Sequence, residues 1–278
     1  MADTDIEWAT KVWNFVRGCR RVSPGCGGPK GTGGCYAEKD AWRFHGPGLP
    51  YEGLVEMGAH GPRWTGKGLF VPEKLAEPMH VRPPTDGSRH RFFVNSMSDL
   101  FHERVPDEFI FQVLNAALQG NRRHTYQVLT KRPERMARWF AENAHRFWHY
   151  HAPDELKHEY VVPDWPDSQL WLGTSIENDR YVGRADALRE TPAAVRFISA
   201  EPLLGPLPSL DLTGIDWLIV GGESGPGHRP MDPEWVRDLV ERADATGVAV
   251  FVKQASGAKP GRQGNLPDDL WARKEYPR

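Results

Sequence analysis

Six short apolar stretches recur along the chain, and polar residues follow each of them directly. The stretches are rich in β-branched and aromatic residues. With the polar residues that follow them, they span 91–101, 125–136, 170–180, 195–205, 216–225 and 248–254. Continuous apolar runs of this kind are typical of strands buried on both faces, as in parallel sheets.

Helical patterns lie between the predicted strands. The segment 106–120 places apolar residues from Phe109 to Leu118 at helical spacing, and Gly120 closes it. Similar patterns follow the second, third and fifth strands, in 132–148, 179–191 and 231–247. Alternating strands and helices indicate βαβ units and a parallel sheet. We therefore predict an α/β fold, in the form of a full or partial parallel (β/α) barrel.

Charged residues follow the predicted strands at equivalent places. The carboxyl ends of the strands of a parallel barrel gather at one mouth, which active sites occupy. A doubly wound sheet also collects ligands at its strand ends, but the chain has neither a G-x-G-x-x-G after the first strand nor a P-loop motif. The pattern therefore predicts one polar site at this edge of the sheet. Its charged residues are Asp99, Lys131, Arg132, Glu177, Glu201, Glu223 and Lys253.

Composition and charge are those of a soluble globular protein. The apolar share is 39%, and the formal net charge of −2 requires no nucleic-acid partner. No apolar run approaches the roughly 20 residues that span a bilayer, and the polar N-terminus is unlike a secretory signal. We expect a cytoplasmic protein without a membrane partner. We expect a single domain over 1–278, with a Gly- and Pro-rich insertion at about 42–84 that covers the barrel mouth, and an irregular tail from about 260.

All three cysteines of the chain, Cys19, Cys26 and Cys35, lie in one glycine-rich loop. Thiols stay reduced in a cytosolic protein, so a disulfide is not expected. The spacing C-x6-C-x8-C lacks the short knuckle of most zinc sites, although His45 could complete a Cys3His set. Three thiolates without an evident fourth ligand also suit an iron–sulfur cluster with one open iron. Both kinds of metal centre remain open on this pattern.

Further motifs accompany the cysteines: "NSMSDLFHERVP", "LTKRPERM", "LGTSIEN", "FISAEPLLGP", "IVGGESGPGHRPM" and "FVKQ". Together with "CYAEK", they resemble a phage-associated radical-SAM-like family of uncharacterised function, over about Ile6 to Gln254. The chain departs from the family's C-x6-C-x2-C-Y-A spacing, because its second gap has eight residues. Residues within Gly27–Gly34 therefore look inserted.

The resemblance implies a radical S-adenosylmethionine (SAM) enzyme. The three cysteines would hold a [4Fe–4S] cluster whose fourth iron binds SAM. Reductive cleavage of SAM would give a 5′-deoxyadenosyl radical that abstracts hydrogen from an unknown substrate, plausibly a nucleotide or a nucleic acid. Such chemistry needs a reductant protein such as flavodoxin or ferredoxin. The cofactors carry the chemistry, and the protein positions them.

The resemblance also implies roles for the polar residues. Ser96, Ser98 and Asp99 would accept hydrogen bonds from the SAM amine, and Lys131 or Arg132 would pair with its carboxylate. Ser175 and Glu177 would contact the ribose or carboxylate, and Tyr36 would lie near the cluster or the adenine. Glu201, Glu223 and Lys253 would face the substrate as catalytic residues.

Two other functions remain open on the sequence. One is a zinc-containing or inactive nucleic-acid-binding protein on the same barrel. The other is an iron–sulfur protein with an electron-transfer or structural role and no SAM chemistry.

Overall fold

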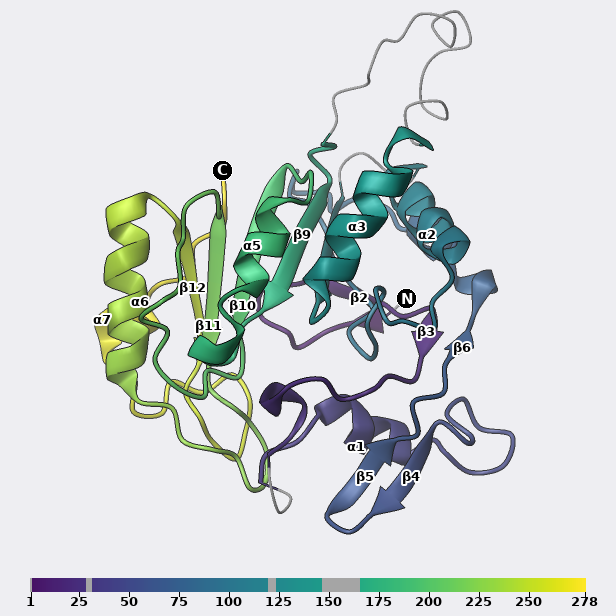
Figure 1. Ribbon diagram of the computed structural model, residues 1–278, viewed down its shortest axis with the longest axis horizontal. Helices are drawn as coiled ribbons and strands as arrows, with labels where there is room; N and C mark the ends of the chain where they lie inside the picture. Colours follow the sequence, from purple (N-terminus) through teal and green to yellow (C-terminus); the bar gives the residue numbers. More distant parts are fainter. Residues whose placement is uncertain (1, 29–31, 120–123, 147–165) are drawn as a thin grey trace, which may run out of the picture.

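The computed structural model describes residues 2–28, 32–119, 124–146 and 166–278. Within them, an eight-stranded sheet of order β1-β2-β7-β8-β9-β10-β11-β12 forms the centre of a mixed α/β fold (Figure 1). Only β1 (Ala2–Asp3) runs antiparallel to its neighbour, β2 (Lys11–Trp13). The sheet is therefore mostly parallel. Strands β1 and β12 are the first and last in this order.

The six predicted strands are all present, adjacent and parallel. Each apolar stretch forms the strand, and the polar residues after it form the loop at the carboxyl edge. The strands are β7 (Arg91–Val94), β8 (Thr125–Thr130), β9 (Leu170–Ser175), β10 (Val195–Ala200), β11 (Trp217–Gly221) and β12 (Ala249–Gln254). The prediction of a parallel α/β sheet is confirmed.

Helices α2 (Asp107–Gln119), α3 (Pro133–Asn143), α5 (Arg184–Arg189) and α6 (Pro233–Thr246) pack around the outer face of the sheet (Figure 1). The start of α6 is set by Asp232, which accepts a hydrogen bond from the Glu234 amide, and by Pro233 in the first turn. Its end is set by Gly247 at φ 74°, a left-handed conformation that glycine adopts without strain. Gly120, expected to close α2, lies outside the described residues. No helix separates β10 from β11.

Aromatic side chains fill the inner face of the sheet. Trp8 lies against Phe93 of β7, with ring centroids 4.7 Å apart, and also against Trp217 of β11, at 6.2 Å. Phe197 of β10 and Phe251 of β12 belong to the same cluster. Strands that are far apart in the sheet order therefore converge on one indole, which requires the sheet to curl around it.

The segment 42–84 is more regular than the predicted covering loop. It contains the antiparallel hairpin of β4 (Val55–Gly58) and β5 (Gly61–Trp64). The short strand β6 (Leu69–Phe70) pairs with β3 (Val16–Arg17), and two 3-10 turns follow at Pro72–Lys74 and Glu77–His80. The hairpin packs against α1 (Tyr36–Trp42), which follows the last cysteine directly. The sequence missed this pairing because its strands are short and lack an apolar alternation.

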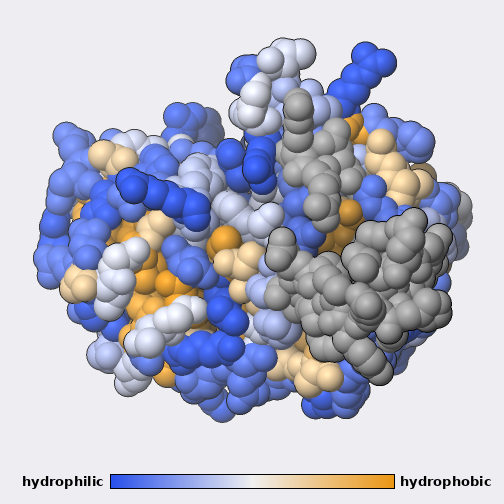
Figure 2. Space-filling view, turned by 90° about the horizontal axis from the view of Figure 1, so that it is seen from above, coloured by the Kyte–Doolittle hydropathy of each residue, from blue (hydrophilic) through white to orange (hydrophobic). Residues whose placement is uncertain are grey.

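The tail after residue 260 is irregular except for two features. Helix α7 (Asp268–Trp271) packs on α6 and β12, and Lys274 forms an antiparallel bridge with Phe251. Seen from above in Figure 2, the molecule presents mostly hydrophilic residues, with apolar residues showing between them. Within the described part of the chain, no helix has both the length and the apolar character needed to cross a bilayer.

Candidate functional site

The cysteine loop spans residues 18–35, and its described parts, 18–28 and 32–35, lie across the carboxyl ends of the parallel strands. Ser23 Oγ donates a hydrogen bond of 2.6 Å to Glu177, which follows β9. The Gly34 amide donates at 3.3 Å to Glu223, which follows β11. The Gly33 amide donates to the Gly227 carbonyl at 2.7 Å. The loop is therefore tied to two strand ends of the sheet.

Glycine is required where the loop meets these carboxylates. A Cβ atom on Gly25 would lie 2.4 Å from Oε1 of Glu177. A Cβ atom on Gly33 would lie 2.3 Å from both carboxylate oxygens of Glu223, and Gly33 has φ +65°. Both distances are shorter than any van der Waals contact, so a side chain would push the loop off the sheet.

The three cysteines are unpaired thiols, each partly buried. Burial raises the pKa of Cys35 to about 11, with smaller contributions from the charges of Glu38 and Cys26. Burial also raises the pKa of Cys19, and both the Asp99 carboxylate and Cys35 act in the same direction. Cys35 therefore lies within electrostatic reach of both other cysteines.

A site for a single metal ion is not formed around these thiols. Among the described residues, no three His, Cys, Asp or Glu side chains make a group that could hold one ion. The ring of His45 stacks on Trp42, with centroids 3.6 Å apart, and its Nδ1 hydrogen bonds to the Trp42 carbonyl. His45 is thus occupied by contacts within its own segment.

Asp99 joins the loops after β7 and β8. It is buried, with 5% exposure, and its Oδ1 accepts from Thr130 Oγ1 at 2.7 Å and from the Phe101 amide at 2.9 Å. Its Oδ2 accepts from the Lys131 amide at 3.1 Å and from Arg132 Nη1 at 2.8 Å. Protein donors therefore occupy both carboxylate oxygens.

Arg132 is engaged on three sides. Besides Asp99, it pairs with Glu103 at 3.0 Å, and it donates at 3.4 Å to the carbonyl of Arg20 in the cysteine loop. The guanidinium also lies close enough to Cys19 to oppose the rise of the thiol pKa. Arg132 thus connects the strand ends to the first cysteine.

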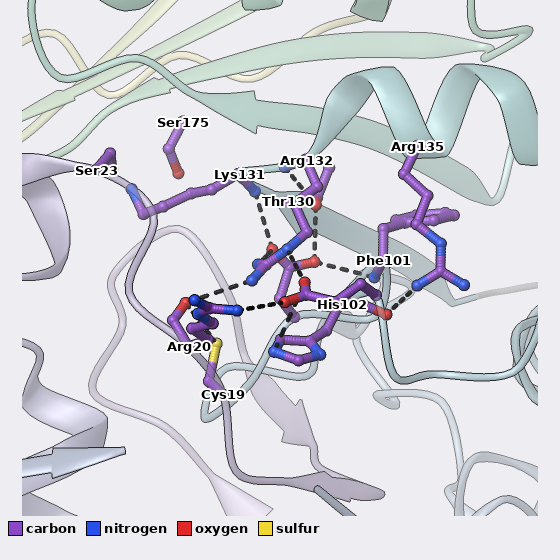
Figure 3. Close-up of polar contacts among 12 residues, drawn as sticks. Cys19, Arg20, Ser23, Phe101, His102, Thr130, Lys131, Arg132, Arg135 and Ser175 are labelled. Atoms are coloured by element: carbon purple, nitrogen blue, oxygen red, sulfur yellow. Dashed lines mark hydrogen bonds and ion pairs between the residues drawn. The ribbon is translucent and has the colours of Figure 1, made fainter. Parts of the chain in front are cut away.

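Glu177 is fully buried between two cations. It pairs with Lys131 and, at 3.1 Å, with Arg184 of α5. Burial alone would raise the pKa of Glu177, but the Lys131 ammonium and the Arg184 guanidinium outweigh it and hold that pKa below its ordinary range. In Figure 3, the Lys131 side chain extends away from Arg132 towards Ser23 and Ser175.

The remaining predicted acids also have cationic partners. Glu201 pairs with Lys253 at 2.9 Å and accepts from the Trp8 indole at 3.2 Å. Glu223 forms a bidentate pair with Arg229, at 2.8 and 2.6 Å. Burial would raise the pKa of Glu223, but the hydrogen bonds from Arg229 hold it below its ordinary range. Each of these carboxylates is therefore paired with a cation.

The predicted hydroxyl residues differ in their engagement. Ser96 Oγ hydrogen bonds to the Asn14 side chain at 3.1 Å, and the Tyr36 hydroxyl donates to the Ser96 carbonyl. Ser98 Oγ is buried and has no hydrogen-bond partner among the described residues. Ser175 is buried at the end of β9, and its carbonyl accepts from Arg184 at 2.7 Å.

Sequence reasoning missed the partners that fix these carboxylates. Arg184, Arg229 and Asn14 were not among the predicted site residues. Arg184 lies one turn into a helical pattern, and nothing in that pattern distinguishes it from surface arginines. Arg229 lies in "GGESGPGHRPM", six residues after the acid that it binds, so this motif carried a usable signal.

The fold and the site define a class: an α/β protein with a mostly parallel sheet and a three-cysteine loop over the carboxyl ends of its strands. Residues 3–267 match the model of a family described as "Protein of unknown function (DUF5131)", and the chain belongs to that family. No curated protein and no solved structure matches the chain.

Proposed function

We propose that the protein is a radical SAM enzyme. The observation that carries the proposal is the position of the cysteines: all three are unpaired, and they share one loop tied over the carboxyl ends of parallel strands. When bound, a [4Fe–4S] cluster would supply the electron that cleaves SAM to methionine and a 5′-deoxyadenosyl radical, which takes a hydrogen atom from substrate. The substrate class that we propose is a nucleotide or a nucleic acid.

The proposed fold is a partial (β/α) barrel. Support comes from the inner aromatic cluster, in which Trp8 contacts residues of β7, β10 and β11. A flat sheet of this strand order would separate those residues by several strand spacings of about 4.8 Å each. In a barrel the polar strand ends surround one mouth, where the cysteine loop would form the cover.

The thiols suit an iron–sulfur cluster. Each thiolate of a [4Fe–4S] cluster binds a different iron, so the cluster does not need three ligands at one ion. A single tetrahedral zinc ion would instead hold its thiolates about 3.8 Å apart. Cluster binding would remove the thiol protons, because the thiolate is the ligand.

Two groups of residues would position SAM beside the cysteine loop. Ser98 Oγ, which has no partner within the described part of the chain, would accept a hydrogen bond from the SAM amine. Lys131 and Arg132 remain candidates for the carboxylate, but each is already paired with an acid and would act as part of that pair. Glu201 and Lys253 form the pair proposed to face the substrate.

The test is anaerobic reconstitution with iron and sulfide, followed by addition of SAM and a reductant such as flavodoxin. We expect about four irons per chain, and formation of 5′-deoxyadenosine. Replacing any one of Cys19, Cys26 and Cys35 with Ser removes both, whereas Val22→Ala in the same loop retains both. A preparation that holds zinc and no iron contradicts the cluster. A stable cluster without SAM cleavage identifies an electron-transfer protein instead.

A further inference from the structure

A small polar cavity lies between the cysteine loop, α1 and the β4–β5 hairpin. Its volume is about 30 Å³, which exceeds the 10–15 Å³ or so that a single water needs. The cysteine loop, α1 and the β4–β5 hairpin line it, with Gly27, Gly28, Cys35, Lys39 and Arg63 among the lining residues. None of the residues predicted at the strand ends lines it. The cavity therefore adjoins Cys35 but is not lined by the predicted strand-end residues.

Two cations of the cavity lack an acidic partner. Among the described residues, neither Lys39 nor Arg63 takes part in any ion pair, although Glu56 faces Arg63 across the hairpin. Arg21 pairs with Glu38 through Nε and Nη2, and this leaves its Nη1 directed at Gly27. Glu38 is the one acid in the lining, and Arg21 already neutralises it.

The same part of the chain is basic although the whole chain is not. Between residues 17 and 67 the sequence has eight lysines and arginines against four acids, whereas the net charge of the chain is −2. A concave site with one sign of charge raises the local concentration of oppositely charged ligands.

The glycines shape the wall of the cavity. A Cβ atom on Gly27 would lie 2.7 Å from Arg21 Nη1, and one on Gly28 would lie 2.5 Å from Thr32 Oγ1. The Arg21 and Thr32 side chains therefore fill the space in which a side chain on either glycine would lie, so only glycine lets them pack against the backbone here. Lys39 extends across the edge of this wall, because Cβ atoms on Gly34 and Gly225 would lie 3.6 and 3.8 Å from its Nζ.

We propose that this cavity binds a phosphate group of the substrate through Lys39 and Arg63. Two unpaired cations, one of them an arginine with a planar fork, suit a dianionic or diester phosphate better than a lone carboxylate. Phosphate contacts position a nucleic acid at a distance from the base that reacts, which agrees with a pocket outside the strand ends. The naming of the substrate class rests on the proposed function, but the binding site does not.

Binding is measured by anisotropy with a fluorescein-labelled oligothymidylate, at several salt concentrations and without SAM. Each phosphate contact contributes about 0.7 to the slope of log affinity against log salt for single strands. Lys39→Met and Arg63→Gln each lower the slope by about that amount, and Lys39→Arg restores it. Lys67→Gln is the matched control, because Lys67 is exposed on the same segment and does not line the cavity.

Further arms identify the source of the phosphate. If thymidine 5′-monophosphate competes with the oligonucleotide and thymidine does not, the site binds a free nucleotide. This competition is lost in Lys39→Met. Displacement by oligonucleotide alone assigns it to a polymer.

Three results overturn the proposal. One is a slope of log affinity against log salt that stays unchanged when Lys39→Met and Arg63→Gln are combined. Another is a reduction of that slope by Lys67→Gln as large as the reduction by Lys39→Met. The third is a loss of SAM binding or of flavodoxin-driven reduction in Lys39→Met while nucleotide binding is intact. Failure of SAM cleavage in the unaltered protein overturns the proposed function and leaves these binding results unaffected.

Discussion

Single residues at the strand ends differ in whether other groups of the protein already form hydrogen bonds with them. Asp99 accepts four hydrogen bonds from the protein, whereas Ser98 Oγ accepts none. The two neighbours were predicted to share one role, binding of the SAM amine. Their surroundings separate a residue that holds two loops together from one whose buried hydroxyl has no partner among the described residues.

Replacing Asp99 with Asn tests its structural role. Arg132 would keep Glu103 but lose its buried partner, so the free energy of unfolding falls by about 3 kcal/mol. Urea denaturation measures the change. Glu103→Gln is the control, since this half-exposed pair contributes less than about 1 kcal/mol. Equal losses in the two variants would contradict the assignment.

Ser98→Ala tests the ligand role that follows from the proposed function. The hydroxyl has no partner to lose, so the unfolding midpoint stays within the range of the unaltered protein. SAM affinity of the reconstituted protein falls about tenfold, as expected when a charge-assisted hydrogen bond is lost. Titration with SAM measures it. Unchanged affinity removes Ser98 from the site.

The sequence could predict which polar residues share the carboxyl edge, because strand ends are local features. It could not predict that Lys131 pairs with Glu177 or Arg229 with Glu223. Such pairs depend on side-chain reach across the sheet, and sequence spacing does not encode that reach. The orphaned hydroxyl of Ser98 is likewise visible only once its neighbours are in place.

At the scale of elements, the cysteine loop is held by acids that belong to the sheet. Glu177 contacts the loop through Ser23 and contacts α5 through Arg184. One buried carboxylate therefore fixes the loop, the end of β9 and a helix relative to one another.

The pKa of Glu177 gives this contact a pH dependence. Because that pKa is below its ordinary range, the paired carboxylate stabilises the fold fully above the unfolded pKa of about 4.3, and the contribution is lost as pH falls through the folded pKa. Glu177→Gln is therefore expected to cost about 3 kcal/mol at pH 7. The difference in the free energy of unfolding between this variant and the unaltered protein shrinks as the pH falls below 4.

Urea denaturation across this pH range measures the effect. Glu190→Gln, at an exposed position, is the control and keeps the pH profile of the unaltered protein. A constant difference between the Glu177 variant and the unaltered protein at all pH values argues against an ionised Glu177.

At the scale of the whole molecule, the C-terminal tail lies along the β12 edge of the sheet. The Val252 amide donates to the Arg273 carbonyl, and the Glu275 amide donates to the Val250 carbonyl, both at 2.9 Å. The tail thus covers the edge of β12, which would otherwise be open to pairing. Lys274 also pairs with Glu7, at 2.9 Å, next to the indole at the centre of the curled sheet.

The sequence predicted the six parallel strands because each is a continuous apolar run. It did not predict that the tail covers this edge, because the tail has no periodic pattern and pairs with residues more than 20 positions away. Tyr276 shows the difficulty, because it is a lone aromatic residue near the end of the chain. Its ring centroid lies 5.3 Å from that of Trp217, and the Arg91 guanidinium lies over the ring, 4.2 Å from its centroid.

Removing residues 273–278 tests whether the tail holds the sheet in its curled form. The deletion exposes Trp217, Phe251 and the edge of β12, and it removes the cation–π contact with Arg91. Loss of one aromatic side chain and of the two backbone hydrogen bonds to β12 is expected to cost about 3–5 kcal/mol. Thermal and urea denaturation measure the loss, and deletion of 277–278 alone is the control.

Tyr276→Ala reproduces the larger part of the effect, because its ring fills the inner cluster. If the full deletion unfolds at the same midpoint as the control, the tail is an appendage, and the inner aromatic residues hold the curled sheet without it.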